Sequence, residues 1–282
     1  IGLTHNLVNL AANGTTRIGL RGGKADPLSP DEMQELLRRV EQDLDEGAGG
    51  VSFGLQYAPD LFCTPEEVLA VAKLVQRKDK IMTVHGRAYS VRSGIYGRDK
   101  TNTSHSVLSL REMIGVARET GVRMQYSHLI FAGSKSHAFF QPCLEELDKA
   151  REAGIDVMTD TFPYHSGISV INVILPLQVQ ANLKDGFNDE NIVATVEHAL
   201  MRMEEVVGLG FKDIQLTFAD DPEFKKYHGL FISEIADDMG MRPAKVVLKL
   251  SEATGGQARI LNHNYSNMAV SYTHLDAADE ED

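Results

Sequence analysis

Predicted helices that end at glycine and lead within a few residues into short apolar strands recur along the first half of this chain. Glycine ends three of these helices, at Gly47, Gly121 and Gly154. Ser29 and Thr64 each precede a proline and have a glutamate three residues on, which is the signature of a helix N-terminus. This alternation is typical of βα units and predicts an α/β fold with a mostly parallel sheet.

The predicted elements extend over most of the chain. Helices are predicted over residues 29–45, 64–77, 108–119, 142–152, 189–203, 231–239 and 243–253, and strands over residues 51–55, 81–85, 122–128, 155–160, 213–218 and 259–263. No clear linker interrupts them, so we predict one domain over residues 1–270. The last residues, 271–282, have no periodicity and finish with acidic side chains. We expect this tail to be non-native and disordered, and the chain to be an internal fragment of a longer protein.

Composition narrows the classes of partner. The 282 residues are 43% hydrophobic and 24% charged, which is ordinary globular material. A formal net charge of −12 argues against nucleic acid or an anionic membrane as partner. No apolar run approaches the length that spans a bilayer. Two cysteines cannot form a disulfide framework, so we expect a reducing, cytoplasmic location. The oligomeric state stays open.

Two histidines carry the chemistry that the sequence suggests. His85 and His128 each end an apolar run that is predicted as a strand. In α/β barrels, the C-terminal ends of parallel strands carry the chemistry, and histidine is the commonest metal ligand. The pair therefore suggests a shared metal site, against the alternative of one core histidine and one exposed histidine. Two imidazoles do not complete a zinc site, so further ligands must come from elsewhere.

Other candidate groups give weaker signals. Gly50, Ser52 and Gly54 match the spacing of a nucleophile elbow, but the flanking residues do not fit a strand followed at once by a helix. We therefore interpret these glycines as allowing close strand packing. After the strand that ends at Asp160, Tyr164 could reach the pocket of the two histidines, or this segment could simply close the strand.

Taken in order, these motifs resemble the N-acyl-D-amino-acid deacylases (D-aminoacylases) of the amidohydrolase superfamily. The matching positions are Gly50, Ser52, Gly54, Leu55, Tyr57 and Pro59, then Thr64, Glu66, Glu67 and Val68, then His85, Arg87, Ser127, His128, Ala132, Gly133, Asp160, Pro163 and Tyr164. The resemblance covers residues 6–270. It implies part of a (β/α)8, TIM-like metal-dependent barrel that hydrolyses an amide bond with a metal-activated water.

The resemblance also implies roles for single residues. His85 and His128 match two zinc ligands, in a site that holds one or two Zn²⁺ ions in the full-length protein. Arg87, Tyr164 and Tyr57 match positions beside the substrate. The proton-shuttling aspartate is expected beyond the chain. The family lysine that helps to bind the substrate carboxylate is replaced by Ile130.

We therefore predict a fragment of a zinc-dependent hydrolase that acts on a linear, non-peptide C–N bond. The expected substrate is a small N-acylated compound, most simply an N-acyl D-amino acid. One alternative is a cyclic-amide hydrolase of the dihydroorotase or hydantoinase type. Another is a barrel that has lost its catalytic activity. We also expect the 282-residue chain alone to be inactive, because it lacks further ligands and the proton shuttle.

Overall fold

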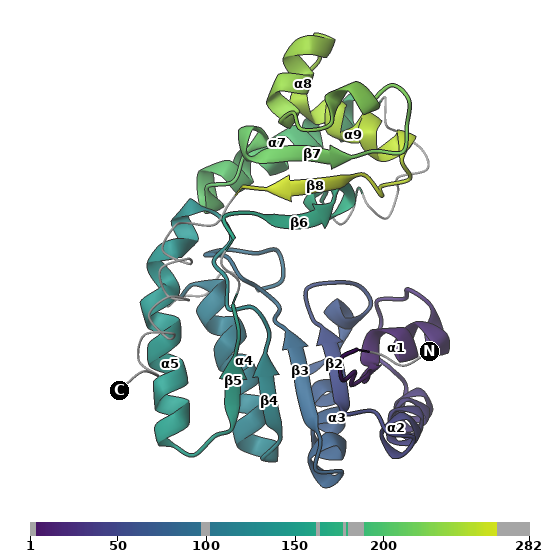
Figure 1. Cartoon of the computed structure of the whole chain (residues 1–282), viewed down its shortest axis with the longest axis vertical. Helices are drawn as coiled ribbons and strands as arrows, with labels where there is room; N and C mark the ends of the chain where they lie inside the picture. Colours follow the sequence, from purple (N-terminus) through teal and green to yellow (C-terminus); the bar gives the residue numbers. More distant parts are fainter. Residues whose placement is uncertain (1–3, 97–101, 162–163, 177–178, 180–188, 264–282) are drawn as a thin grey trace. The chain divides into compact units, whose positions relative to one another are not determined.

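The computed structural model describes residues 4–96, 102–161, 164–176, 179 and 189–263 (Figure 1). The chain divides into two compact units, one formed by residues 1–130 and 139–161 and the other by residues 131–138 and 162–282. Each unit has its own sheet. That residues 1–270 form one domain stays a prediction. The tail 271–282 lies outside the described residues.

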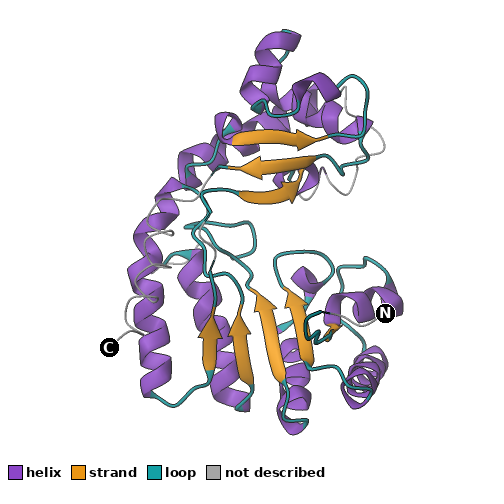
Figure 2. Ribbon diagram, in the orientation of Figure 1, coloured by secondary structure: helices purple, strands orange, loops and turns teal. Residues whose placement is uncertain are grey.

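The first unit is built on a five-stranded parallel sheet in the order β1-β2-β3-β4-β5. Its strands are β1 (Leu10–Ala12), β2 (Gly50–Gly54), β3 (Ile81–His85), β4 (Arg123–Tyr126) and β5 (Val157–Thr159), and its helices are α1 (Asn13–Arg21), α2 (Pro30–Asp45), α3 (Pro65–Arg77), α4 (His105–Thr120) and α5 (Phe140–Glu152). The predicted α/β alternation is therefore confirmed in this unit (Figure 2).

Alternate residues of the central strands form the core of the first unit. The buried side chains are Val51, Phe53, Met82, Val84, Met124 and Tyr126, which all point to one face of the sheet. Residues on the opposite face are mostly only half-buried. At Gly50 the strands approach so closely that an added Cβ would lie 2.0 Å from the carbonyl oxygen of Ile81. The glycine therefore serves close strand packing.

The N-terminal elements β1 and α1 were not predicted from the sequence. The sequence of α1 contains glycine and two threonines, and no side chain caps its first turn. A buried ion pair stabilises α1 instead, because Arg17 Nη1 lies 2.8 Å from Glu67 Oε2 in α3. Arg17 is fully buried. Tertiary contact thus fixes a helix that local propensity does not specify.

The second unit contains an antiparallel sheet of three strands in the order β6-β8-β7. Its strands are β6 (Gly167–Val170), β7 (Ile214–Phe218) and β8 (Arg259–Asn262), and its helices are α7 (Glu190–Val207), α8 (Ile232–Met239) and α9 (Pro243–Ala253). The predicted strands near 213–218 and 259–263 are present, but their pairing is antiparallel and β6 was not predicted. A separate core lies beneath this sheet, including Ile214, Leu216 and Ile260.

Within the part of the chain that the structure describes, no helix combines the length and the apolar character needed to cross a bilayer.

Candidate active site

The two histidines that the sequence singles out meet at the C-terminal edge of the parallel sheet. His85 is the last residue of β3, and His128 lies two residues beyond the end of β4. Because β3 and β4 are adjacent and parallel, their ends lie at the same edge. His85 Nδ1 and His128 Nε2 are 2.5 Å apart. The structure thus brings together two imidazoles that are 43 residues apart in sequence.

The two ring nitrogens are within hydrogen-bond distance of each other. Two facing lone pairs repel, so one nitrogen of the pair carries the hydrogen that joins His85 Nδ1 to His128 Nε2. Burial, followed by the proximity of His128, lowers the pKa of His85 to about 3. Burial also lowers the pKa of His128, against the opposing charge of Asp160. Both rings are therefore neutral at physiological pH, which is the form that binds a metal.

A tyrosine hydroxyl links the segments that follow the two strands. Tyr89 Oη accepts a hydrogen bond from Gly86 N at 2.6 Å and donates one to Ser127 O at 2.9 Å. Gly86 follows His85, and Ser127 precedes His128. The buried Tyr89 thus fixes the spacing of the two imidazoles, a role that no sequence signal indicated.

The backbone of His128 adopts an unusual conformation. Its φ of 38° lies in the left-handed region, which is uncommon for residues other than glycine. Asp160, which directly follows β5, stabilises this turn twice. Its side-chain Oδ1 accepts a hydrogen bond from His128 N, and its carbonyl oxygen accepts one from Leu129 N at 2.7 Å. Asp160, at the end of the strand that pairs with β4, therefore helps to position the imidazole of His128.

The three residues predicted beside the substrate are in different surroundings. Tyr57 is 46% exposed, and its ring centroid lies 4.8 Å from that of His85. Arg87 is buried, where it donates to Glu112 Oε1 at 2.9 Å and to the carbonyl oxygens of Leu61 and Cys63. Tyr164 is exposed in the second unit. A substrate-binding role for these three residues stays a prediction.

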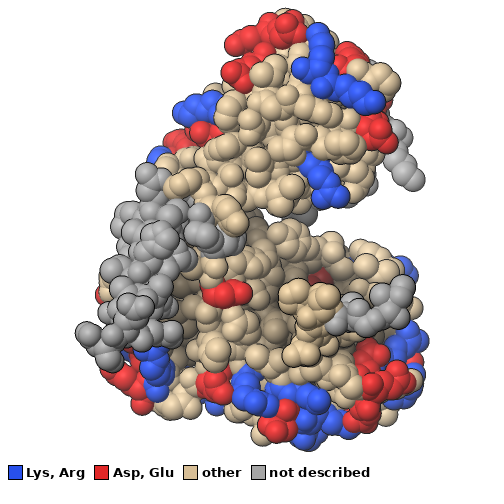
Figure 3. Space-filling model, viewed as in Figure 1, with Lys and Arg blue, Asp and Glu red and all other residues tan. Residues whose placement is uncertain are grey.

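The surroundings of the histidine pair fit part of a metal site. A zinc ion is held by nitrogens about 2.0–2.1 Å away, so two histidines that share it have ring nitrogens within about 3.5 Å. The two ring nitrogens are 2.5 Å apart, so the imidazoles would have to move slightly apart to share a zinc ion. Among the described residues, no group of three or more His, Cys, Asp and Glu side chains is arranged to hold a metal. On the face shown in Figure 3, the charged side chains of the first unit gather mainly at the end of the sheet where the strands begin.

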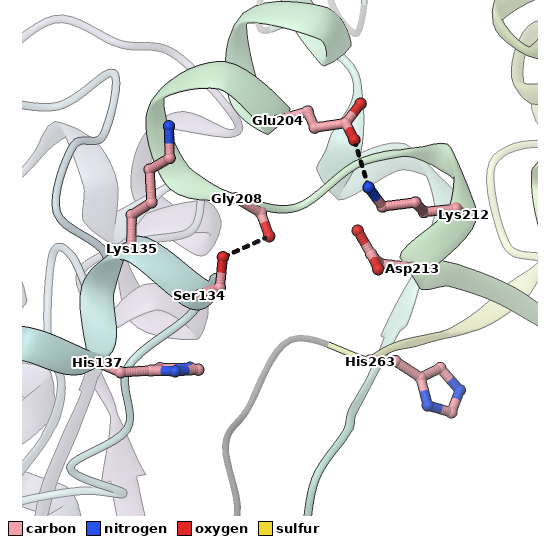
Figure 4. A pocket seen from close by; sticks show the side chains of 8 residues that line it. All are labelled: Ser134, Lys135, His137, Glu204, Gly208, Lys212, Asp213 and His263. Atoms are coloured by element: carbon pink, nitrogen blue, oxygen red, sulfur yellow. Dashed lines mark hydrogen bonds and ion pairs between the residues drawn. The ribbon is translucent and has the colours of Figure 1, made fainter.

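A pocket in the second unit uses none of the predicted site residues. Its volume is about 420 Å³, and Figure 4 shows the residues that line it, which are Ser134, Lys135, His137, Glu204, Gly208, Lys212, Asp213 and His263. Glu204 and Lys212 form an ion pair at 2.8 Å. His263 Nε2 hydrogen-bonds Gln215 Oε1 at 2.9 Å. The lining thus mixes charges of both signs and does not define a ligand, so we place the candidate chemistry at the histidine pair.

Comparison with known proteins identifies relatives in both sequence and structure. No protein-family model matches the chain. In sequence it is 25% identical over 167 residues to N-acyl-D-glutamate deacylase of Alcaligenes xylosoxydans xylosoxydans, which covers 59% of this chain. The chain spans 31% of that protein's length.

Solved structures extend the likeness to nearly the whole chain. N-acyl-D-glutamate deacylase of Bordetella bronchiseptica, solved with zinc and a phosphonate mimic of the tetrahedral intermediate, has a TM-score of 0.68 at 18% identity. It covers 94% of this chain, which spans 46% of it. D-aminoacylase, described as defining a novel subset of amidohydrolases, has a TM-score of 0.65 at 19% identity and covers 92% of this chain, which spans 44% of it. The chain is thus similar in sequence, over 56–59% of its length and at 24–25% identity, to N-acyl-D-amino-acid deacylases, and it shares the α/β fold of the solved deacylase structures.

Proposed function

We propose that the protein containing this chain is a zinc-dependent hydrolase that cleaves the amide bond of a small N-acylated amino acid. The observation that carries this proposal is the 2.5 Å approach of His85 Nδ1 and His128 Nε2 at the C-terminal edge of a parallel sheet. N-acyl-D-amino acids are the first substrates to test, because the relatives in sequence and structure are N-acyl-D-amino-acid deacylases.

His85 would bind zinc through Nδ1 and His128 through Nε2, because these are the atoms that converge. Zinc, when bound, supplies Lewis-acid polarisation of the amide carbonyl and lowers the pKa of water. The chain's contribution is to hold two neutral imidazoles in place. Tyr89 sets their spacing through Gly86 and Ser127, and Asp160 fixes the backbone of His128.

Tyr57 is the substrate-binding candidate with the clearest geometric support. Its ring lies against His85 and is 46% exposed, so its hydroxyl can meet a polar group of a ligand. Arg87 has different contacts, because its guanidinium donates hydrogen bonds to Glu112 and to the carbonyl oxygens of Leu61 and Cys63. We propose that Tyr57 contacts the substrate. Arg87 stabilises the backbone of residues 61–63 beside the site through its hydrogen bonds.

The test is a substrate panel with the zinc-loaded protein that contains this chain. N-acyl-D-amino acids, their L-enantiomers and cyclic ureides are assayed for hydrolysis. We expect turnover of the linear N-acyl compounds, and a loss of at least about a hundredfold in His85→Ala and His128→Ala, because each variant removes a metal ligand. His198→Ala is the matched control, since His198 is exposed on α7 of the second unit.

Three results would contradict this proposal. Turnover of cyclic ureides alone would assign the protein to the cyclic-amide hydrolases. Zinc binding that is unchanged in both histidine variants would remove the pair from the metal site. A zinc-loaded protein that binds the panel compounds without turning them over would point to a barrel without catalytic activity.

A further inference from the structure

The ring of His85 has a second partner besides His128. His85 Nε2 lies 2.8 Å from the side-chain oxygen Oε1 of Gln56. An amide oxygen only accepts hydrogen bonds, so the nitrogen that faces it carries the proton. The neutral imidazole of His85 therefore has its hydrogen on Nε2. Its other nitrogen, Nδ1, is unprotonated and accepts the hydrogen bond from His128 Nε2.

The protonated nitrogen decides whether His85 can bind a metal in this orientation. A neutral imidazole has one protonated and one unprotonated nitrogen, and only the latter binds a metal. Rotated by half a turn, the Gln56 amide would present its NH2 group to Nε2. That contact would favour the hydrogen on Nδ1 and would block the converging lone pair. The observed orientation is the one that permits metal binding.

The turn that follows β2 places Gln56 next to His85. Gly54 is paired with His85 in the parallel sheet, and Leu55 N donates to His85 O at 3.0 Å. A tight turn follows, in which Tyr57 N donates to Gly54 O at 2.9 Å. Gln56 lies at this turn, one residue after the last strand-like contact. Its position is therefore tied by backbone hydrogen bonds to the histidine that it contacts.

We propose that Gln56 is a positioning residue that holds the His85 proton on Nε2 and so presents Nδ1 to the metal. This inference rests on the proposed function, because it assigns the ion to the same histidine pair. Such hydrogen bonds to the far nitrogen of a metal-binding histidine fix its tautomer and its ring orientation.

The experiment compares the protein that contains this chain with its variants Gln56→Leu, Gln56→Glu and Gln76→Leu. Long-range 1H–15N spectra of metal-free, 15N-histidine-labelled protein report which ring nitrogen of His85 carries the hydrogen. Competition with a chromogenic chelator gives the zinc dissociation constant. Gln76→Leu is the matched control, because Gln76 is exposed near the C-terminus of α3, at the end of the sheet where the strands begin.

We expect His85 to carry its hydrogen on Nε2 in the unmodified chain and in Gln76→Leu. Gln56→Leu should show both ring tautomers and a zinc dissociation constant about tenfold to a hundredfold higher. Gln56→Glu should keep the tautomer and the affinity, because a carboxylate also accepts the hydrogen bond. Unchanged tautomer and affinity in Gln56→Leu would overturn the inference.

The two measurements separate this inference from the proposed function. A protein that shows the Nε2–H tautomer and loses it in Gln56→Leu, but binds no zinc, would support the role of Gln56 and contradict the metal site. Zinc binding through His85 and His128 with equal affinity in all four proteins would support the metal site and contradict the role of Gln56.

Discussion

Single residues at the strand ends carry the strongest functional argument. The sequence indicated His85 and His128, because each ends an apolar run. It did not indicate the contacts that orient them, which come from Gln56 on His85 and from Asp160 on the backbone of His128. These partners lie on other strand ends, far away in sequence. A sequence pattern can identify a ligating residue type, but the orientation of its ring depends on neighbours that only the fold supplies.

Asp160 gives a test of the left-handed conformation of His128. Without its carboxylate, the turn at φ 38° loses a hydrogen bond to a charged group, worth about 1.5–3 kcal/mol. We expect Asp160→Ala to weaken zinc binding by about tenfold or more, and Asp160→Asn to retain it, because an amide oxygen still accepts from His128 N. Isothermal titration with zinc measures the difference.

Asp156→Ala is the control for that experiment, since Asp156 is an exposed aspartate beside the other end of β5. Equal zinc affinity in Asp160→Ala and Asp156→Ala would show that the His128 turn holds its conformation without the carboxylate.

Local sequence signals define some of the helices, whereas tertiary contacts define some of the strands. The capping box at Ser29 and the Thr64 cap are present, and they begin α2 and α3 as predicted. These signals act within four residues, so a sequence contains all of the information. The strands β1 and β6 have three and four residues and were not predicted. Their pairing with β2 and with β8 defines them.

The contact between α4 and α5 should depend on pH. Arg111 Nη2 lies 3.0 Å from Glu146 Oε1, and Arg111 first, with help from Lys149, lowers the pKa of Glu146. A carboxyl whose pKa is lower in the folded state stabilises fully above its unfolded value of 4.5. That stabilisation is lost as the pH falls through the folded-state pKa.

We therefore expect the free energy of unfolding to fall less steeply with acid in Glu146→Gln than in the unmodified chain. Urea unfolding across the acid range measures the slope. Glu145→Gln, which changes an exposed neighbour, should keep the original slope. Identical slopes in all three proteins would mean that this ion pair does not contribute to stability.

At the scale of the whole molecule, the two histidines belong to only one of the two compact units. A ligand that binds the folded state stabilises what it binds, by about 2.7 kcal/mol at a concentration a hundredfold above its dissociation constant. We expect zinc to slow amide hydrogen exchange in β2, β3 and β4, and to leave β6, β7 and β8 unchanged. Hydrogen exchange followed by mass spectrometry measures this, with chelator added to reverse the effect.

Equal protection of both sheets by zinc would contradict that expectation, because it would mean that the two units open together. Protection by zinc of β6, β7 and β8 alone, reversed by the chelator, would instead place the zinc site in the second unit.

The sequence by itself determined the α/β alternation of the first unit, most helix starts and the two histidines of the candidate metal site. Those features depend on periodicity, capping and the position of a residue at a strand end, which are all local. Only the tertiary structure decided the second sheet, the buried Arg17–Glu67 pair and the 2.5 Å approach of His85 to His128. Each of these joins residues that are 41 or more positions apart, and such contacts arise from packing rather than from local sequence.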